Sequence, residues 1–264
     1  MKYPIALLLA FFVLSAQAEM PWAVALDGEQ RSEANKARDA YRHPRATLEF
    51  FGIKEGMTVL EISPGGGWYT EILAPLTQEK GTLYAAHYAL NGSDAYYRNS
   101  LGKFLQKMAA TPALYDQLII TQLQPPSELT AAPEGTVDLA LAFRNVHSWL
   151  EAGTAEQTLA AIYSALKPGG VLGLVQHRAK PDTSVEDMVE SGYVTEKQVL
   201  ALASKAGFKL LDSSDINANQ ADTASHPEGV WTLPPALYLG EVDREKYLAV
   251  GESDRMTMKF VKPR

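Results

Sequence analysis

Cysteine is absent from this chain of 264 residues, and its absence excludes thiolate metal ligands, a cysteine nucleophile and disulfide bonds. The chain also has no excess of basic residues, since its 24 Lys and Arg and 31 Asp and Glu give a formal net charge of −7. A general nucleic-acid-binding protein would need a basic face, so we exclude that class. The five histidines show no His-x-x-x-His or similar spacing, and we predict no metal site.

The first residues have the parts of a secretory signal peptide. Lys2 supplies a positive charge, residues 5–14 form an uninterrupted apolar run, and Ala16-Gln17-Ala18 has the small-x-small form of a cleavage site. We expect residues 1–18 to be removed and the mature chain to be periplasmic or secreted. No second long apolar run follows, so we expect no membrane anchor after cleavage. The competing interpretation is a buried N-terminal helix.

The mature chain, residues 19–264, has the composition of one globular domain, with 46% hydrophobic and 21% charged residues overall. Short apolar segments alternate with helical ones, which predicts an α/β fold with a parallel sheet covered by helices. We see no clear helix before the last predicted strand, so that strand is free to run antiparallel. The predicted strands are residues 58–62, 82–86, 117–121, 137–143, 171–175, 208–211 and 256–261.

The predicted helices are marked by capping and breaking residues. Thr195 and Gln198 form a capping box, with Gly207 at the position of a C-terminal cap. We expect interruptions at His43-Pro44 and near Pro75. Proline and small residues predict a loop at 124–135, and residues 217–235 are interpreted as a long insertion. The predicted helices are residues 32–51, a segment from 68, and residues 91–108, 154–166 and 195–206.

A glycine-rich turn follows the first predicted strand. The strand carries Glu61 near its end and leads into Ser63-Pro64-Gly65-Gly66-Gly67. Glycine lets a backbone approach a ligand closely, and the carboxyl edge of an open α/β sheet is where ligands bind. Thr70 stands where a dinucleotide fingerprint needs its third glycine, and no P-loop lysine follows. The alternative is a plain strand-to-helix turn.

Basic and polar residues follow other predicted strands. His87, His147 and His177 come just after strands, as do Arg144, Asn145 and Arg178. Carboxyl ends of parallel strands meet in one crevice, so we expect these side chains to converge. The alternative is that each loop is polar surface, with Arg144 and Arg178 paired to nearby acids such as Glu151 or Asp182. The charged segment 38–44 is either solvated surface or a lid.

The glycine segment resembles motif I of the class I S-adenosylmethionine (SAM)-dependent methyltransferases. The match is Val59-Leu60-Glu61-Ile62, then Ser63 in place of the first glycine, then Gly65 and Gly67. Residues 81–87, 137–142 and 166–172 are similar to later parts of that family, and the resemblance extends over about residues 34–263. ISPGGGWYTEIL and FRNVHSW resemble a group of exported bacterial proteins called predicted methyltransferases.

The resemblance implies a Rossmann-like class I methyltransferase fold. It would have a seven-stranded, mostly parallel sheet, an antiparallel last strand and helices on both faces. It also implies SAM as cofactor. His87 stands where the family usually has an acidic ribose ligand, and Gln122 stands where a polar residue meets adenine. The implied cofactor-binding residues are Glu61, Ser63, Gly65, Gly66, Gly67, His87, Gln122 and Asn145.

These observations predict methyl transfer from SAM to a small anionic acceptor. We assign His147 as general base, because imidazole titrates near neutral pH, and place Arg144, His177 and Arg178 at the acceptor. The first alternative is an exported protein that binds an adenosyl ligand or small molecule on this scaffold without transfer activity. The second is a nucleotide-dependent oxidoreductase, which Thr70 and His87 disfavour.

Overall fold

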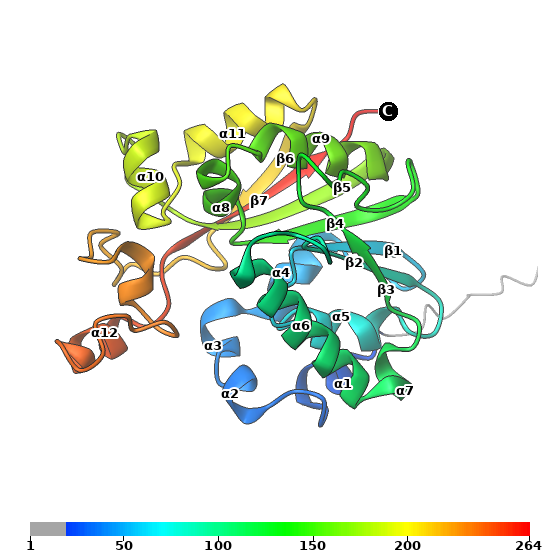
Figure 1. Cartoon of the computed structure of the whole chain (residues 1–264), viewed down its shortest axis with the longest axis horizontal. Helices are drawn as coiled ribbons and strands as arrows, with labels where there is room; N and C mark the ends of the chain where they lie inside the picture. Colours follow the sequence, from blue (N-terminus) through cyan, green and yellow to red (C-terminus); the bar gives the residue numbers. More distant parts are fainter. Residues whose placement is uncertain (1–19) are drawn as a thin grey trace, which may run out of the picture.

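A seven-stranded sheet forms the centre of the computed structural model (Figure 1), which describes residues 20–264. The predicted signal peptide at residues 1–18 lies outside the described residues. The strands are β1 (Thr58–Ile62), β2 (Thr82–His87), β3 (Ile119–Gln122), β4 (Val137–Phe143), β5 (Leu166–His177), β6 (Lys209–Ser214) and β7 (Arg255–Val261). Their order is β3-β2-β1-β4-β5-β7-β6. β7 is antiparallel to both of its neighbours, and the other pairs are parallel, which confirms the predicted fold.

One face of the sheet is covered by the helices of the N-terminal half, in the lower part of Figure 1. They bury Leu48, Ile72 and Phe104 against Val59 and Leu141 of the sheet. These helices are α1 (Trp22–Asp27), α2 (Glu33–Lys36), α3 (Asp39–Arg42), α4 (Pro44–Phe51), α5 (Thr70–Thr77), α6 (Ala95–Ala110) and α7 (Pro112–Tyr115).

The opposite face is covered by helices that follow β4. Trp149, Leu159 and Val199 pack there against Leu60 and Ile62 of β1. Because successive residues of β1 contribute to opposite clusters, the strand is apolar along nearly its whole length, as expected for a strand buried on both faces. These helices are α8 (Val146–Glu151), α9 (Ala155–Ala165), α10 (Val185–Ser191) and α11 (Glu196–Lys205). Helices on both faces are therefore confirmed.

The predicted break of the helical segment 32–51 at His43-Pro44 is confirmed, and α4 ends at Phe51 as predicted, but a second break at residues 37–38 was not predicted. Three short helices, α2, α3 and α4, occupy this range, and His43 joins the last two with a φ of 40°. The helix was expected to kink or end near Pro75, and α5 includes Pro75 and ends two residues later, at Thr77. Proline cannot donate a hydrogen bond to the carbonyl of Glu71, and Gln30 Nε2 donates to that oxygen instead at 3.3 Å.

The predicted strands 58–62 and 137–143 have the bounds of β1 and β4, and the other five differ from the predictions at one or both ends. β2 includes His87, and β5 extends from Leu166, because Leu166 already pairs with Val137 and the Gly169–Gly170 turn bonds to Lys262 beside β7. The predicted cap of α11 is confirmed, since Thr195 accepts a bond from the Gln198 N–H. No helix within residues 20–264 has both the length and the apolar character needed to cross a bilayer.

The chain between β6 and β7 forms a separate lobe at the left of Figure 1. The predicted insertion at 217–235 has only one short 3-10 helix, η1 (Gly229–Thr232). A helix between the last two strands was not predicted, but α12 (Arg244–Val250) forms there. It buries only Tyr247, so it has no apolar periodicity that the sequence could reveal.

Candidate functional site

A cavity of about 390 Å³ lies beyond the carboxyl ends of β1, β4 and β5, as open α/β sheets predict. The segment 35–42 and the segment 61–66 form two of its walls. The residues that follow β4 and end β5, together with residues 230–236, form the others. Of the predicted site residues, the cavity brings together Glu61, Ser63, Gly65, Gly66, Arg144, Asn145, His147 and His177.

The glycine loop presents bare backbone to this cavity. A Cβ added to Gly65 or Gly66 would meet nothing within 4 Å, and Gly65 has a φ of 58°. Ser63 also adopts a positive φ, of 46°, which is unusual for a residue with a side chain. Gly67 differs, because a Cβ there would lie 3.2 Å from the ring of Phe104. Gly67 is thus required for packing against α6, and it does not line the cavity.

Glu61 is a buried carboxyl group that lines the cavity and is only 2% exposed. Its Oε2 accepts a hydrogen bond of 2.6 Å from Thr70 Oγ1. Burial raises the pKa of Glu61 to about 7, although the Thr70 bond and the charge of Lys107 act in the opposite direction. Glu61 can therefore change its charge near neutral pH.

His87 and Gln122 support loops and do not line the cavity. The Tyr88 N–H donates to His87 Nδ1 at 2.8 Å, so Nε2 carries the proton and donates to the Gly65 carbonyl at 3.1 Å. Gln122 Oε1 accepts from the Leu90 N–H at 2.6 Å. Neither predicted cofactor ligand lines the cavity, and both side chains are bonded to the backbone of neighbouring loops.

A smaller hollow of about 80 Å³ adjoins the cavity. Tyr88, Tyr97 and Gln124 line it, and Ser63 and Asn145 lie at its boundary with the larger cavity. Sequence reasoning missed Tyr97 and Gln124. Gln124 lies two residues beyond the one we selected, at the start of a proline-rich loop, and nothing in the sequence distinguishes the two amides.

Arg144 and Asn145 follow β4 directly. Asn145 Nδ2 donates to the Ile62 carbonyl at 2.8 Å and so ties the ends of β4 and β1 together. Arg144 has a φ of 62°, a strained conformation of the kind found at binding sites. Among the described residues, Glu252 is the carboxylate that acts most strongly on its charge, and no ion pair or hydrogen bond of its guanidinium is formed. Burial lowers the pKa of Arg144 to about 10, and it remains charged at neutral pH.

His147 is held in one tautomer by Gln176. The Gln176 amide has a fixed orientation, because Oε1 accepts from the Val146 N–H and Nε2 donates to the Gly192 carbonyl, both at 3.1 Å. Gln176 Nε2 also lies 3.2 Å from His147 Nδ1. Since the amide nitrogen can only donate, His147 Nδ1 accepts, and the ring proton of His147 is on its own Nε2. Burial, then the charge of Arg144, lowers the pKa of His147 to about 4. This geometry opposes the predicted general base and makes His147 a hydrogen-bond donor.

His177 lies beside His147, with ring centroids 5.7 Å apart. Its Nδ1 lies 2.5 Å from Ser253 Oγ. Burial and then the charge of Arg144 lower the pKa of His177 well below its usual range, so this imidazole is also neutral at physiological pH.

Arg178 does not reach the cavity, contrary to the prediction. Its guanidinium donates to both carboxylate oxygens of Asp254, at 2.9 and 3.0 Å. It also donates to Glu196 and Asp215, each at 3.2 Å. Hydrogen bonds to Asp254 raise the pKa of Arg178. The alternative of an arginine paired with acids therefore holds for Arg178, though with partners other than Glu151 or Asp182.

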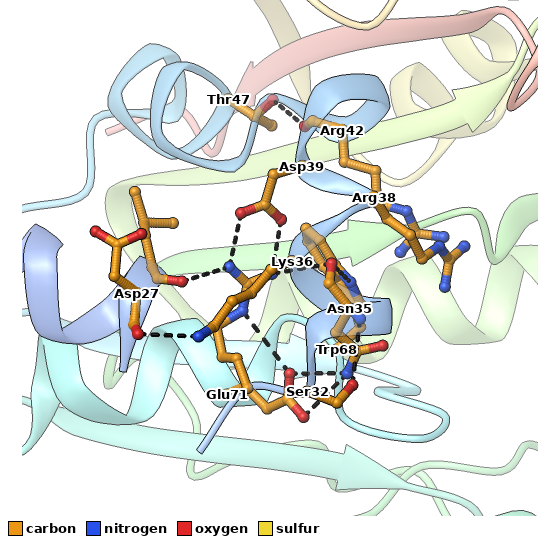
Figure 2. Close-up of polar contacts among 12 residues, drawn as sticks. Asp27, Ser32, Asn35, Lys36, Arg38, Asp39, Arg42, Thr47, Trp68 and Glu71 are labelled. Atoms are coloured by element: carbon orange, nitrogen blue, oxygen red, sulfur yellow. Dashed lines mark hydrogen bonds and ion pairs between the residues drawn. The ribbon is translucent and has the colours of Figure 1, made fainter. Parts of the chain in front are cut away.

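Two further arginines reach the cavity from the N-terminal segment. Arg38 and Arg42 line it, together with Glu252 from just before β7. Helix α3, which carries both arginines at its ends, is tied to the rest of the fold by a polar network around Glu71 (Figure 2). Its contacts include the Arg31–Asp39 ion pair and the bond from Asn35 Nδ2 to Glu71 Oε2. Segment 38–44 therefore forms part of the cavity wall. In the sequence, only the high density of charged residues distinguished this segment.

No group of three or more acidic or histidine side chains that could hold a metal ion occurs among residues 20–264.

The sequence matches no family model and no curated protein. Solved structures with the same fold are found. A SAM-dependent methyltransferase from Aquifex aeolicus superposes with a TM-score of 0.55 at 19% identity, over 86% of this chain and 93% of that one. The fold is that of the SAM-dependent methyltransferases.

Two other structures with this fold differ in what they do. The cyclase SpnF matches with a TM-score of 0.57 at 16% identity, over 89% of this chain and 85% of that one. Phosphoethanolamine N-methyltransferase 2 of Haemonchus contortus, in complex with phosphomonomethylethanolamine and S-adenosylhomocysteine, has a TM-score of 0.55 at 14% identity. This match covers 92% of our chain and 59% of that one. Fold alone does not fix the reaction.

Proposed function

We propose that the protein transfers a methyl group from SAM to a small anionic acceptor. One observation carries this proposal: the open backbone of the glycine loop and the unpaired guanidinium of Arg144 face the same cavity. The methyltransferase fold supports the choice of cofactor. When bound, SAM supplies a methyl group on a positively charged sulfur, which is the electrophile of the reaction.

The residues present fit this cofactor. The backbone from Ser63 to Gly66 leaves space for the methionyl part, and ionised Glu61 would attract its ammonium group. The adjoining hollow, lined by Tyr97 and Gln124, offers an aromatic ring and an amide to the adenine. Asn145 would hold the two strand ends at the boundary.

The acceptor would lie on the opposite side of the cavity. Arg144 can grip a carboxylate or phosphate with two parallel hydrogen bonds, and His147 Nε2 can donate a third. His147 thereby orients the acceptor and removes no proton. In a methyl transfer the protein mainly aligns the reacting atoms and excludes water, and residues 230–236 supply an apolar wall for that purpose.

We also propose export. The signal-peptide features of residues 1–18 support a periplasmic or secreted location, and the acceptor would then be a molecule of that compartment.

The second candidate is a binding protein on this scaffold without transfer activity. The low pKa of His147 favours it, because an acceptor that must lose a proton would find no base there. A nucleotide-dependent oxidoreductase is less well supported, since Thr70 fills the third glycine position and donates to Glu61.

Calorimetric titration of the mature protein with SAM, S-adenosylhomocysteine and NAD separates these functions. We expect both adenosyl ligands to bind and NAD to give no heat. Binding without transfer of labelled methyl to any anionic acceptor would favour the second candidate. Absence of adenosyl-ligand binding would refute both the enzyme and the adenosyl-binding protein.

A further inference from the structure

We propose that the acceptor carries a single doubly charged oxyanion, a phosphate monoester, held by Arg38, Arg42 and Arg144. The inference rests on the proposed function, because it identifies the chemical class of that acceptor. It assigns two arginines of the N-terminal segment to the substrate.

The acceptor side of the cavity has a large excess of positive charge. Arg38 Nε donates to Glu252 Oε1 at 2.6 Å, and Arg42 Nε donates to Oε2 at 3.0 Å. Arg255 Nη1 lies 3.3 Å from the same Oε2, and Arg144 is close enough for the Glu252 charge to affect it. Arg255 does not line the cavity and is also affected by the charge of Asp254. The three arginines that line the cavity, Arg38, Arg42 and Arg144, thus share one carboxylate, and these four side chains carry a net charge of +2.

Both carboxylate oxygens of Glu252 are bonded to these arginines, and the group is ionised. Burial acts to raise its pKa, but Arg42, Arg255 and Arg38 together hold the pKa of Glu252 at about 2. Glu252 is 4% exposed, so water does little to screen the remaining charges. Buried charges are stable only when they are paired and hydrogen-bonded, and a bound anion would provide both.

Two guanidinium nitrogens are buried without a partner. Arg38 Nη2 and Arg42 Nη2 make no hydrogen bond within the described residues, although Arg42 is only 2% exposed. Both side chains line the cavity. Leaving a charged donor buried and unsatisfied costs more than the net gain of an ordinary hydrogen bond. These nitrogens are therefore placed to donate to a ligand.

The orientation of Arg42 is fixed before any ligand binds. Its guanidinium carbon lies 4.7 Å from the centre of the Trp68 ring, a cation–π geometry. Trp68 Nε1 in turn donates to the Asn35 carbonyl at 3.1 Å. Figure 2 shows Arg38 and Arg42 projecting together, away from the network around Glu71. A site fixed in this way binds an anion without ordering its side chains first.

The charge balance favours a dianion over a monocarboxylate. A dianion would neutralise these four side chains, whereas a monoanion would leave one positive charge, and a bound sulfonium would add another nearby. A phosphate monoester has three terminal oxygens that can accept from three guanidinium groups, and arginine is suited to bidentate contacts with phosphate. A carboxylate has only two oxygens.

The test is calorimetric titration of the mature protein with inorganic phosphate, sulfate, acetate and malonate at constant ionic strength and slightly alkaline pH. Phosphate and sulfate should bind at least tenfold more tightly than acetate. Arg144→Gln should weaken phosphate binding roughly tenfold or more, because a charge-assisted donor is lost, and it leaves no carboxylate unpaired. Arg42→Gln should do the same. Arg45→Gln, which alters a 53% exposed side chain paired with Glu49, is the matched control.

Equal affinities for phosphate and acetate would overturn the inference, as would unchanged phosphate binding in folded Arg144→Gln. Malonate carries its two charges on two separate carboxylates. Tighter binding of malonate than of phosphate would therefore contradict a site for one doubly charged group. A parallel titration with SAM keeps the two proposals distinct. SAM binding without phosphate binding refutes the inference alone. Phosphate binding without adenosyl-ligand binding refutes the proposed function and leaves an anion site.

Discussion

Replacing Glu61 with glutamine should stabilise the protein, and increasingly so as pH rises. Glu61 is 2% exposed, and burial raises its pKa from the ordinary 4.5 to about 7. Below pH 4.5 the carboxyl is protonated in both the folded and the unfolded chain and costs nothing. As pH rises from 4.5 to 7, the unfolded chain ionises first, so the free energy of unfolding falls.

The magnitude follows from the size of the pKa change. Each pKa unit corresponds to about 1.4 kcal/mol, so ionised Glu61 lowers the free energy of unfolding by roughly 3 kcal/mol above pH 7. Glutamine has nearly the same shape and stays neutral at every pH. Glu61→Gln should therefore exceed the stability of the wild type by less than about 1 kcal/mol at pH 5 and by roughly 3 kcal/mol near pH 8.

Urea unfolding of both proteins at pH 5, 6, 7 and 8 measures this difference. Other titrating groups are shared by the two proteins and largely cancel, including the buried histidines. Glu49→Gln, at a carboxylate whose side chain is 49% exposed, should differ little from the wild type at any pH. A constant difference between Glu61→Gln and wild type from pH 5 to 8 would refute the reasoning.

The same residue links pH to cofactor binding. An ammonium group beside Glu61 would favour the ionised carboxylate. SAM affinity should therefore increase as pH rises towards 7, and binding at pH 6 should release a proton. Titrations in buffers of different ionisation enthalpy detect that release, and Glu61→Gln should abolish it.

Three other predictions concern the loop, the imidazole and the start of the chain. Gly65→Val should block adenosyl-ligand binding in a folded protein, whereas Gly67→Val should lower Tm because its side chain would meet an aromatic ring of α6. Calorimetry and thermal unfolding measure these effects, and unchanged binding by Gly65→Val would contradict the assignment. Nitrogen NMR should show the His147 proton on Nε2 in the wild type and a mixture of tautomers in Gln176→Leu. A proton on Nδ1 in the wild type would contradict the donor role. N-terminal sequencing of exported protein should show cleavage after Ala18, and an intact Met1 would disprove it.

Local patterns in the sequence were sufficient to predict the sheet and the glycine loop. The apolar segment ending in Glu61 and Ile62 predicted β1, and the glycines after it predicted the turn at its carboxyl end. Arg144, His147 and His177 were expected to converge because parallel strands end at one edge, and all three line the cavity. The α12 helix escaped prediction because it is short and nearly all exposed.

The acceptor side of the site was decided by contacts between distant parts of the chain. Arg42 and Glu252 are 210 residues apart in sequence, so no spacing could reveal that they meet. Arg178 follows its strand as Arg144 follows its own, yet three carboxylates bind Arg178 and none pairs with Arg144 in the described structure.

The sequence by itself thus determined which strand ends would gather and that the glycine turn would lie at the edge where they gather. Those features depend on strand periodicity and on the missing Cβ, both of which are local. Only the tertiary structure decided the tautomer of His147, the charge behaviour of Glu61 and the assembly of the arginines. Burial and hydrogen-bond partners set these properties, and both come from residues brought together by folding.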